Sequence, residues 1–184
     1  DLASSRGARW LSPLPQAPES TDAAAAQARR DLVLRSWRDQ FFFREEEILE
    51  DGTVSPGLRG PQMGALHAVL AHWKVSDATG TVVMPTGTGK TETMLALLVA
   101  RRIPRLLVVV PSDALRVQVG RKFLTLGWLK AFGVVGQAAR LPVVGMLTRM
   151  PQSREDADRI LMQCNVLVTT MAIASGMSLR DDAL

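Results

Sequence analysis

One stretch of the sequence carries the residue types that phosphate binding requires. It reads Met84-Pro85-Thr86-Gly87-Thr88-Gly89-Lys90-Thr91. Glycines let successive backbone N–H groups close around a phosphate without interference from side chains. A lysine can reach the β- and γ-oxygens of a nucleotide, and the hydroxyl that follows it can ligate Mg²⁺. We therefore predict a phosphate-binding loop in which Lys90 and Thr91 are the catalytic residues and Thr91 holds the metal.

The segments on either side of this loop have the character that would position it. Thr81–Met84 is a short apolar run with β-prone residues, and an apolar helical pattern extends from the loop to Arg102. The N-terminal end of a helix is partly positive and attracts an anion. We expect a strand, the loop and then a helix. A glycine-rich turn met by chance would not explain this setting.

The rest of the chain alternates between short apolar runs and helical patterns. We expect further strands at 105–110, 142–148 and 165–169, and helices at 61–73, 112–126, 153–163 and 171–178. Continuous apolar strands that alternate with helices are typical of parallel βαβ units. The predicted fold class is therefore α/β, a P-loop parallel sheet with helices on both faces.

The N-terminal part differs from this pattern. Residues 1–21 are rich in Pro, Ser and Ala and predict a flexible arm. Residues 22–56 predict a helical extension, because its apolar residues share one helical stripe: Leu34, Trp37, Phe41 and Ile48. We expect this aromatic area to pack into a core. The alternative is that the triplet Phe41–Phe43 binds a protein partner.

Composition limits the class of protein. The chain has 184 residues, of which 47% are hydrophobic and 22% are charged, so disorder over its whole length is excluded. No apolar run is long enough for a membrane span. The single cysteine, Cys164, fits a reducing cytoplasm. The net charge of +4 comes mainly from arginine, since only four of the 22 cations are lysines. These charges are spread along the chain, so they do not by themselves indicate a nucleic-acid partner.

The loop also resembles a known family. Met84 stands where the strict GxxxxGK[ST] pattern has glycine, and this form resembles motif I of superfamily 2 helicases of the DEAD/DEAH type, ResIII-like members included. Upstream, Leu58-Arg59-Gly60-Pro61-Gln62 resembles the element whose glutamine reads adenine. The resemblance implies that residues 57–184 are part of a RecA-like lobe that binds ATP and Mg²⁺. It assigns nucleotide contacts to Arg59, Gln62, Pro85, Thr86, Gly87, Thr88, Gly89, Lys90, Thr91 and Glu92.

Two further segments resemble the family's nucleic-acid contacts. Val110-Pro111-Ser112 with Gln118 is similar to motif Ia, and Thr169-Thr170 stands where motif Ib is expected. The resemblance implies that Pro111, Ser112, Thr169 and Thr170 contact the backbone of DNA or RNA. Ser112 could instead be a simple helix cap, and threonines are common at strand ends.

The family's acidic motif is not found in this sequence. Arg180-Asp181-Asp182 follows a helix rather than a strand, and an arginine finger and second RecA-like lobe are also missing. We expect a truncated lobe of a longer protein that hydrolyses ATP negligibly alone. The expected partners are the second lobe, DNA or RNA, and a protein on the Trp37/Phe41 helix. The expected function is an ATP-dependent helicase or translocase. The alternatives are a P-loop conformational switch and a small-molecule kinase; Met84 argues against the kinase.

Overall fold

The structure is a computed structural model that describes residues 8–10 and 23–181. The chain divides into two compact units. The first is built from the chain up to Arg35, from Pro104–Thr125 and from Leu141 onward. The second is built from Ser36–Ile103 and Leu126–Arg140.

The first unit contains a four-stranded sheet in the order β1-β5-β6-β4. Three strands are parallel: β4 (Leu106–Val110), β5 (Val144–Leu147) and β6 (Val166–Thr170). β1 (Ala8–Trp10) pairs antiparallel with β5. The expected flexible arm is therefore wrong at residues 8–10, because the free edge of β5 offers backbone groups that an extended segment can pair with. The rest of the expected arm lies outside the described residues.

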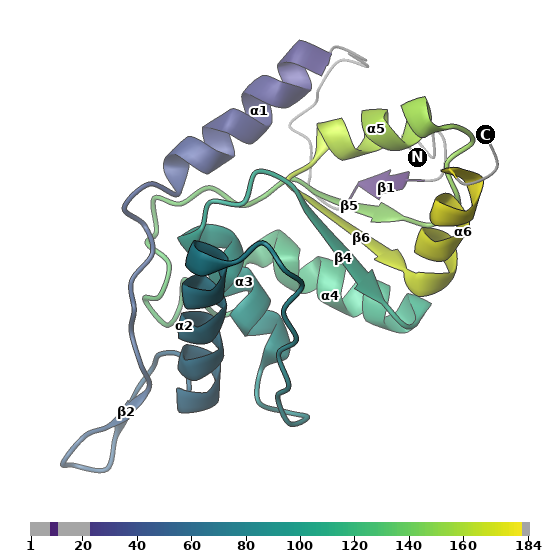
Figure 1. The fold of residues 1–184 in the computed structure, drawn as a ribbon. Helices are drawn as coiled ribbons and strands as arrows, with labels where there is room; N and C mark the ends of the chain where they lie inside the picture. Colours follow the sequence, from purple (N-terminus) through teal and green to yellow (C-terminus); the bar gives the residue numbers. More distant parts are fainter. Residues whose placement is uncertain (1–7, 11–22, 182–184) are drawn as a thin grey trace. The chain divides into compact units, whose positions relative to one another are not determined.

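Helices cover both faces of this sheet (Figure 1). α4 (Asp113–Thr125) lies on one face, while α5 (Arg154–Gln163) and α6 (Met171–Asp181) lie on the other. The β4-to-β5 and β5-to-β6 connections run in opposite directions along the sheet, so right-handed crossovers place α4 and α5 on opposite faces. Leu147, Ile160 and Leu167 form the core beneath α5. The predicted α/β class is confirmed.

The helical extension expected over residues 22–56 is wrong beyond Ser36. α1 is Ala23–Ser36, and the chain then turns at Asp39, whose φ is +57°. β2 (Glu47–Ile48) and β3 (Val54–Ser55) form a hairpin around Gly52, whose φ is +80°. The helical spacing of the apolar residues could not reveal this hairpin, in which Ile48 is exposed rather than packed.

The aromatic residues after α1 have two different environments within the second unit. Trp37 is 1% exposed, as expected for core packing, and its Nε1 donates to the Arg140 carbonyl at 2.9 Å. Phe42 and Phe43 are about half exposed. The helix expected at Trp37 and Phe41 is absent, since α1 ends at Ser36. A protein partner on the triplet Phe41–Phe43 remains a prediction.

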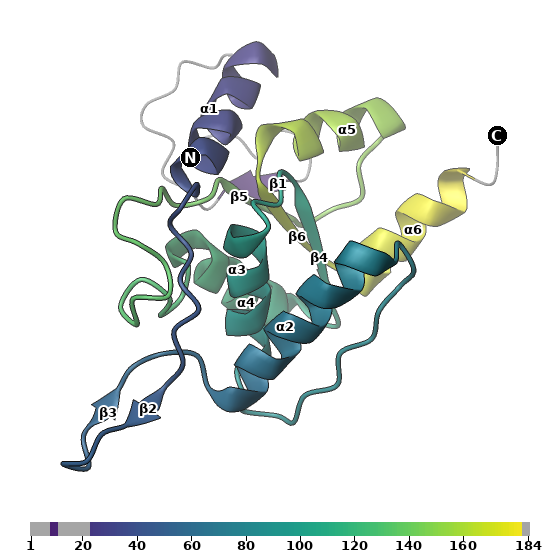
Figure 2. The ribbon, with the colours of Figure 1, turned by 60° about the vertical axis from the view of Figure 1, so that its left-hand side comes forward.

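The second unit is centred on two packed helices, α2 (Gly60–Val75) and α3 (Lys90–Ala100), which lie side by side in both ribbon views (Figures 1 and 2). Leu66 on α2 and Leu95 on α3 are fully buried. The strand expected at Thr81–Met84 is wrong: these residues have no regular structure, and Val83 is 89% exposed. An apolar run becomes a strand only beside a partner strand, and no described strand pairs with this one.

Candidate nucleotide-binding site

The phosphate loop leads directly into α3. Gly87 and Gly89 have left-handed backbones, with φ of +84° and +87°, which glycine adopts without strain. Gly89 is the N-cap of α3, and no side chain caps this helix. The positive end of the α3 dipole and its first N–H groups are therefore presented at the loop, as an anion site requires.

One carbonyl group organises the loop. The Pro85 oxygen accepts hydrogen bonds from Thr88 Oγ1 at 2.7 Å and from Lys90 Nζ at 2.9 Å. The Thr88 N–H also points to it, at 3.4 Å. Lys90 is exposed and Thr91 is half-buried. The lysine ammonium thus lies over the loop, held by one hydrogen bond that a charged oxygen could replace.

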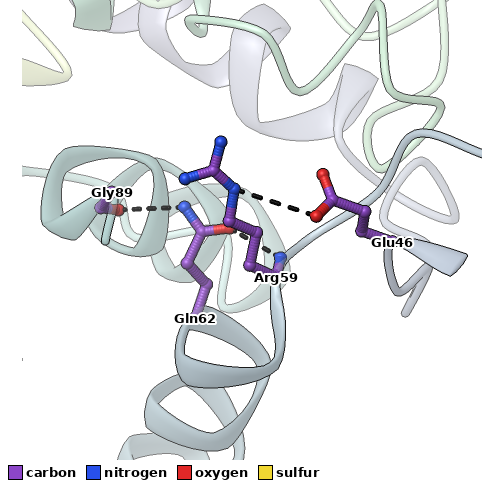
Figure 3. Close-up of polar contacts among 4 residues, drawn as sticks. All are labelled: Glu46, Arg59, Gln62 and Gly89. Carbon is purple, nitrogen blue, oxygen red and sulfur yellow. Dashed lines mark hydrogen bonds and ion pairs between the residues drawn. The ribbon is translucent and has the colours of Figure 1, made fainter. Parts of the chain in front are cut away.

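Gln62 joins the start of α2 to the loop (Figure 3). Its Oε1 accepts from the Arg59 N–H at 2.8 Å, and its Nε2 donates to the Gly89 carbonyl at 3.3 Å. The side chain is only 6% exposed. A Cβ atom at position 89 would lie 1.9 Å from Gln62 Nε2. The two hydrogen bonds of Gln62, which we call the Gln62 clamp, leave no room for a side chain at position 89. The clamp and the left-handed φ therefore both require glycine at this position.

The residues around this clamp are less tightly held. Arg59 Nε lies 3.9 Å from Glu46 Oε1 (Figure 3), and both side chains are substantially exposed, so this ion pair contributes little to stability. Glu92, in the first turn of α3, is buried, with Oε2 close to Gly89. Every residue for which a nucleotide contact was predicted thus lies in the second unit, on the start of α2, the loop or the start of α3.

Thr93 lies at this site but was not among the predicted contacts. Its Oγ1 lies 3.4 Å from the Gly89 carbonyl and 3.8 Å from Met84 Sδ. A threonine four residues after the helix start commonly bonds back to that carbonyl, and this spacing could have revealed the contact. Thr93 ties Met84, the residue that departs from the strict loop pattern, to α3.

The predicted nucleic-acid contacts lie in the first unit, at the carboxyl ends of two neighbouring strands. Val110 is opposite Thr170 in the parallel register of β4 and β6. Ser112 is exposed, and its Oγ accepts from the Leu115 N–H at 3.4 Å, a helix cap. Thr169 is fully buried, and its Oγ1 has no partner among the described residues. Ser112 is thus accessible in this arrangement, and the Thr169 hydroxyl is not.

Three other findings limit the functions of the described chain. Among the residues that the structure describes, no group of three or more His, Cys, Asp or Glu side chains could hold a metal ion. No helix in the described ranges is long and apolar enough to cross a membrane. Cys164 is 1% exposed, and this burial raises the pKa of its thiol to about 12, so the thiol is a core group rather than a nucleophile.

The first unit has a sheet of the parallel α/β type, and the second has a loop of the P-loop type that leads into a glycine-capped helix, so the chain is consistent with a truncated P-loop domain. A family model described as "Type III restriction enzyme, res subunit" matches residues 55–172, which is more than half of the chain. The chain therefore belongs to this family, a helicase superfamily 2 ATPase-lobe domain. No curated protein and no solved structure matches it.

Proposed function

We propose that the chain binds MgATP at the phosphate loop and that this binding drives a helicase or translocase. The observation that carries the proposal is the start of α3, where a left-handed Gly89 leaves the helix without a side-chain cap and Lys90 follows at once. These groups fit a nucleoside triphosphate, because Gly89, Lys90 and Thr91 offer a backbone N–H, an ammonium group and a hydroxyl in succession. Mg²⁺ would supply charge neutralisation between the β- and γ-phosphates.

Each residue of the site has a specific task in this proposal. Lys90 Nζ exchanges the Pro85 carbonyl for a phosphate oxygen, a stronger, charge-assisted bond. The Thr91 hydroxyl would hold the metal ion. Gln62 holds Arg59 and Gly89 with one lone pair and one N–H, so its amide retains a further acceptor and a further donor. These remaining groups are the ones that would read the edge of adenine.

We assign nucleic-acid contact to the carboxyl edge of β4 and β6. Ligands of open parallel sheets gather at this edge, and the exposed start of α4 presents N–H groups suited to a backbone phosphate. Such contacts position a strand without reading its bases. Membership of the family supports an ATP-driven motor on DNA or RNA. Hydrolysis additionally needs an acidic pair that holds the metal and orients water, for which no residue of this chain is assigned.

The test is ATPase activity of the intact protein with and without single-stranded DNA or RNA. Two variants at one position separate phosphate contact from helix capping. Ser112→Asn keeps a good cap, and Ser112→Asp keeps the cap but adds a charge that repels phosphate. We expect Ser112→Asp to lose most of the stimulation by nucleic acid while its basal ATP affinity stays that of wild type.

Two outcomes would contradict parts of this proposal. Full stimulation in Ser112→Asp would remove this edge from the nucleic-acid path. ATP binding without any stimulation by DNA or RNA, in wild type, would favour a P-loop conformational switch over a helicase or translocase.

A further inference from the structure

Arg30 on α1 is a buried charge for which the described part of the chain provides no partner. The residue is only 7% exposed, and its Nε is completely buried. Its guanidinium makes no hydrogen bond or salt bridge with any other residue in the described ranges. Burying a charge is costly unless an opposite charge or hydrogen-bond acceptors compensate for it. A bound anion would therefore compensate for the buried charge of Arg30.

Two titratable groups beside Arg30, the Cys164 thiol and the Asp31 carboxyl, do not provide this anion. Arg30 lies close enough to Cys164 to lower the pKa of its thiol, but burial outweighs this effect and raises the pKa to about 12. The thiol is thus neutral at physiological pH. Asp31 follows Arg30 on α1, and successive residues on a helix do not face each other. No salt bridge joins Asp31 to Arg30 in the described structure.

A cavity of about 230 Å³ opens beside Arg30, within the first unit. It is lined by α1, by the segment before β4 and by the end of α5: Gln27, Arg30, Asp31, Leu34, Pro104, Arg105 and Met162. Arg105 brings a second guanidinium, whose Nη1 lies 3.2 Å from Met162 Sδ, a weak acceptor. The lining therefore contains two guanidinium groups and one amide but only one carboxylate, so it carries a net positive charge and is rich in hydrogen-bond donors.

We propose that this cavity binds an oxyanion of the phosphate class, held by Arg30 and Arg105. The planar guanidinium donates paired N–H groups that match the spacing of phosphate oxygens. The cavity lies at the amino end of β4, and Ser112 lies just past its carboxyl end, about 17 Å away for a five-residue strand. The site is therefore separate from the proposed nucleic-acid edge and does not depend on the proposed function.

The test is thermal unfolding of this chain in increasing inorganic phosphate, with chloride adjusted to keep the ionic strength constant. Because the phosphate loop is a second anion site, all variants carry Lys90→Ala. A ligand that binds only the folded state raises Tm in proportion to the logarithm of its concentration once the site is saturated. We expect phosphate to raise Tm, and Arg30→Met to weaken its binding by about tenfold or more.

Three matched variants make the result specific to the cavity. Arg35→Met removes an exposed charge from the same helix and should leave the phosphate response unchanged. Arg105→Met changes an exposed residue, which does not endanger folding, and should weaken the response. Asp31→Asn removes the one acidic group of the lining and should strengthen it.

A single-stranded oligonucleotide distinguishes the two sources of phosphate. If the cavity takes nucleic-acid backbone, Arg30→Met weakens oligonucleotide binding and free phosphate competes with it; if it takes a free anion, oligonucleotide binding is unchanged. Equal phosphate responses in the Lys90→Ala parent and its Arg30→Met derivative would overturn the proposal. A large drop in Tm of Arg30→Met in phosphate-free buffer would also overturn it, since Arg30 would then be paired within the chain.

Discussion

At the scale of single residues, the two loop glycines differ in what surrounds them. Both have left-handed backbones, but a Cβ at Gly87 would meet nothing within 4 Å, and a Cβ at Gly89 would meet Gln62 Nε2 at 1.9 Å. The sequence pattern treats the two positions alike. Only the structure shows that the Gln62 side chain of α2 donates a hydrogen bond to the loop at Gly89.

This difference predicts unequal effects of alanine at the two positions. Gly87→Ala should cost about 1–2 kcal/mol, the strain of a left-handed alanine. Gly89→Ala should cost at least twice as much, because it also breaks the Gln62 contact. Urea unfolding measures both, and equal losses would show that the Gln62 clamp is not formed.

Cys164 allows a prediction from its pKa. Burial raises the folded-state pKa from its ordinary value of 9.0 to about 12. The neutral thiol is favoured by folding, so the contribution of Cys164 to stability is complete below pH 9 and is lost as pH rises from about 9 to about 12. At pH 8 a thiol reagent should modify Cys164 only after unfolding by urea. Rapid modification of the native chain would contradict its burial.

At the scale of elements, Gln62 determines how the start of α2 meets the phosphate loop. Its Oε1 and Nε2 connect Arg59 and Gly89, residues thirty positions apart in the sequence. A hydrogen bond of this kind contributes on the order of 1 kcal/mol, and more when its loss leaves a buried group unpaired.

We predict that Gln62→Ala lowers the free energy of unfolding by about 1–3 kcal/mol, since both contacts are lost. Gln62→Glu keeps the acceptor for the Arg59 N–H and replaces the donor to Gly89 with a second acceptor. Both variants should bind ATP more weakly than wild type. Calorimetry and urea unfolding check the two effects, and wild-type ATP affinity in both variants would show that the clamp does not shape the site.

The elements also show where sequence patterns succeed. The strands near 106–110, 144–147 and 166–170 and their intervening helices were predicted, because continuous apolar runs bounded by helical patterns are distinctive. The helix beyond Ser36 and the strand at Thr81–Met84 were not predicted correctly. Both errors arise because local apolarity does not reveal a turn such as that at Asp39 or the absence of a pairing strand.

The residues of the candidate site also differ in whether the sequence could predict them. The loop residues could be predicted because glycine, lysine and threonine at fixed spacing have a direct chemical reason. The contact of Gln62 with the Gly89 carbonyl could not, because it depends on how α2 and α3 pack. The hydrogen bonds to the Pro85 carbonyl could not either, because they depend on the conformation of the loop. Arg30 was also hidden, since the sequence shows a charge but not its burial.

At the scale of the whole molecule, the proposed contact between the carboxyl edge of β4 and β6 and backbone phosphates predicts a salt-dependent interaction with nucleic acid. If two or three backbone phosphates are contacted, log affinity for a single strand should fall with log salt with a slope of about −1.4 to −2.1. Fluorescence anisotropy at several salt concentrations measures this slope. Binding that is independent of salt, or that depends strongly on base sequence, would contradict backbone contact.

Nucleotide binding at the phosphate loop is tested most directly by calorimetric titration of MgATP into the wild-type chain, Lys90→Ala and Lys74→Ala. Lys90 Nζ lies on the loop carbonyl that a phosphate would replace, whereas Lys74 is an exposed lysine in the last turn of α2. We predict at least a tenfold loss of affinity in Lys90→Ala and none in Lys74→Ala, with both variants folded. Equal affinity in the wild type and Lys90→Ala would contradict the phosphate loop as the nucleotide site.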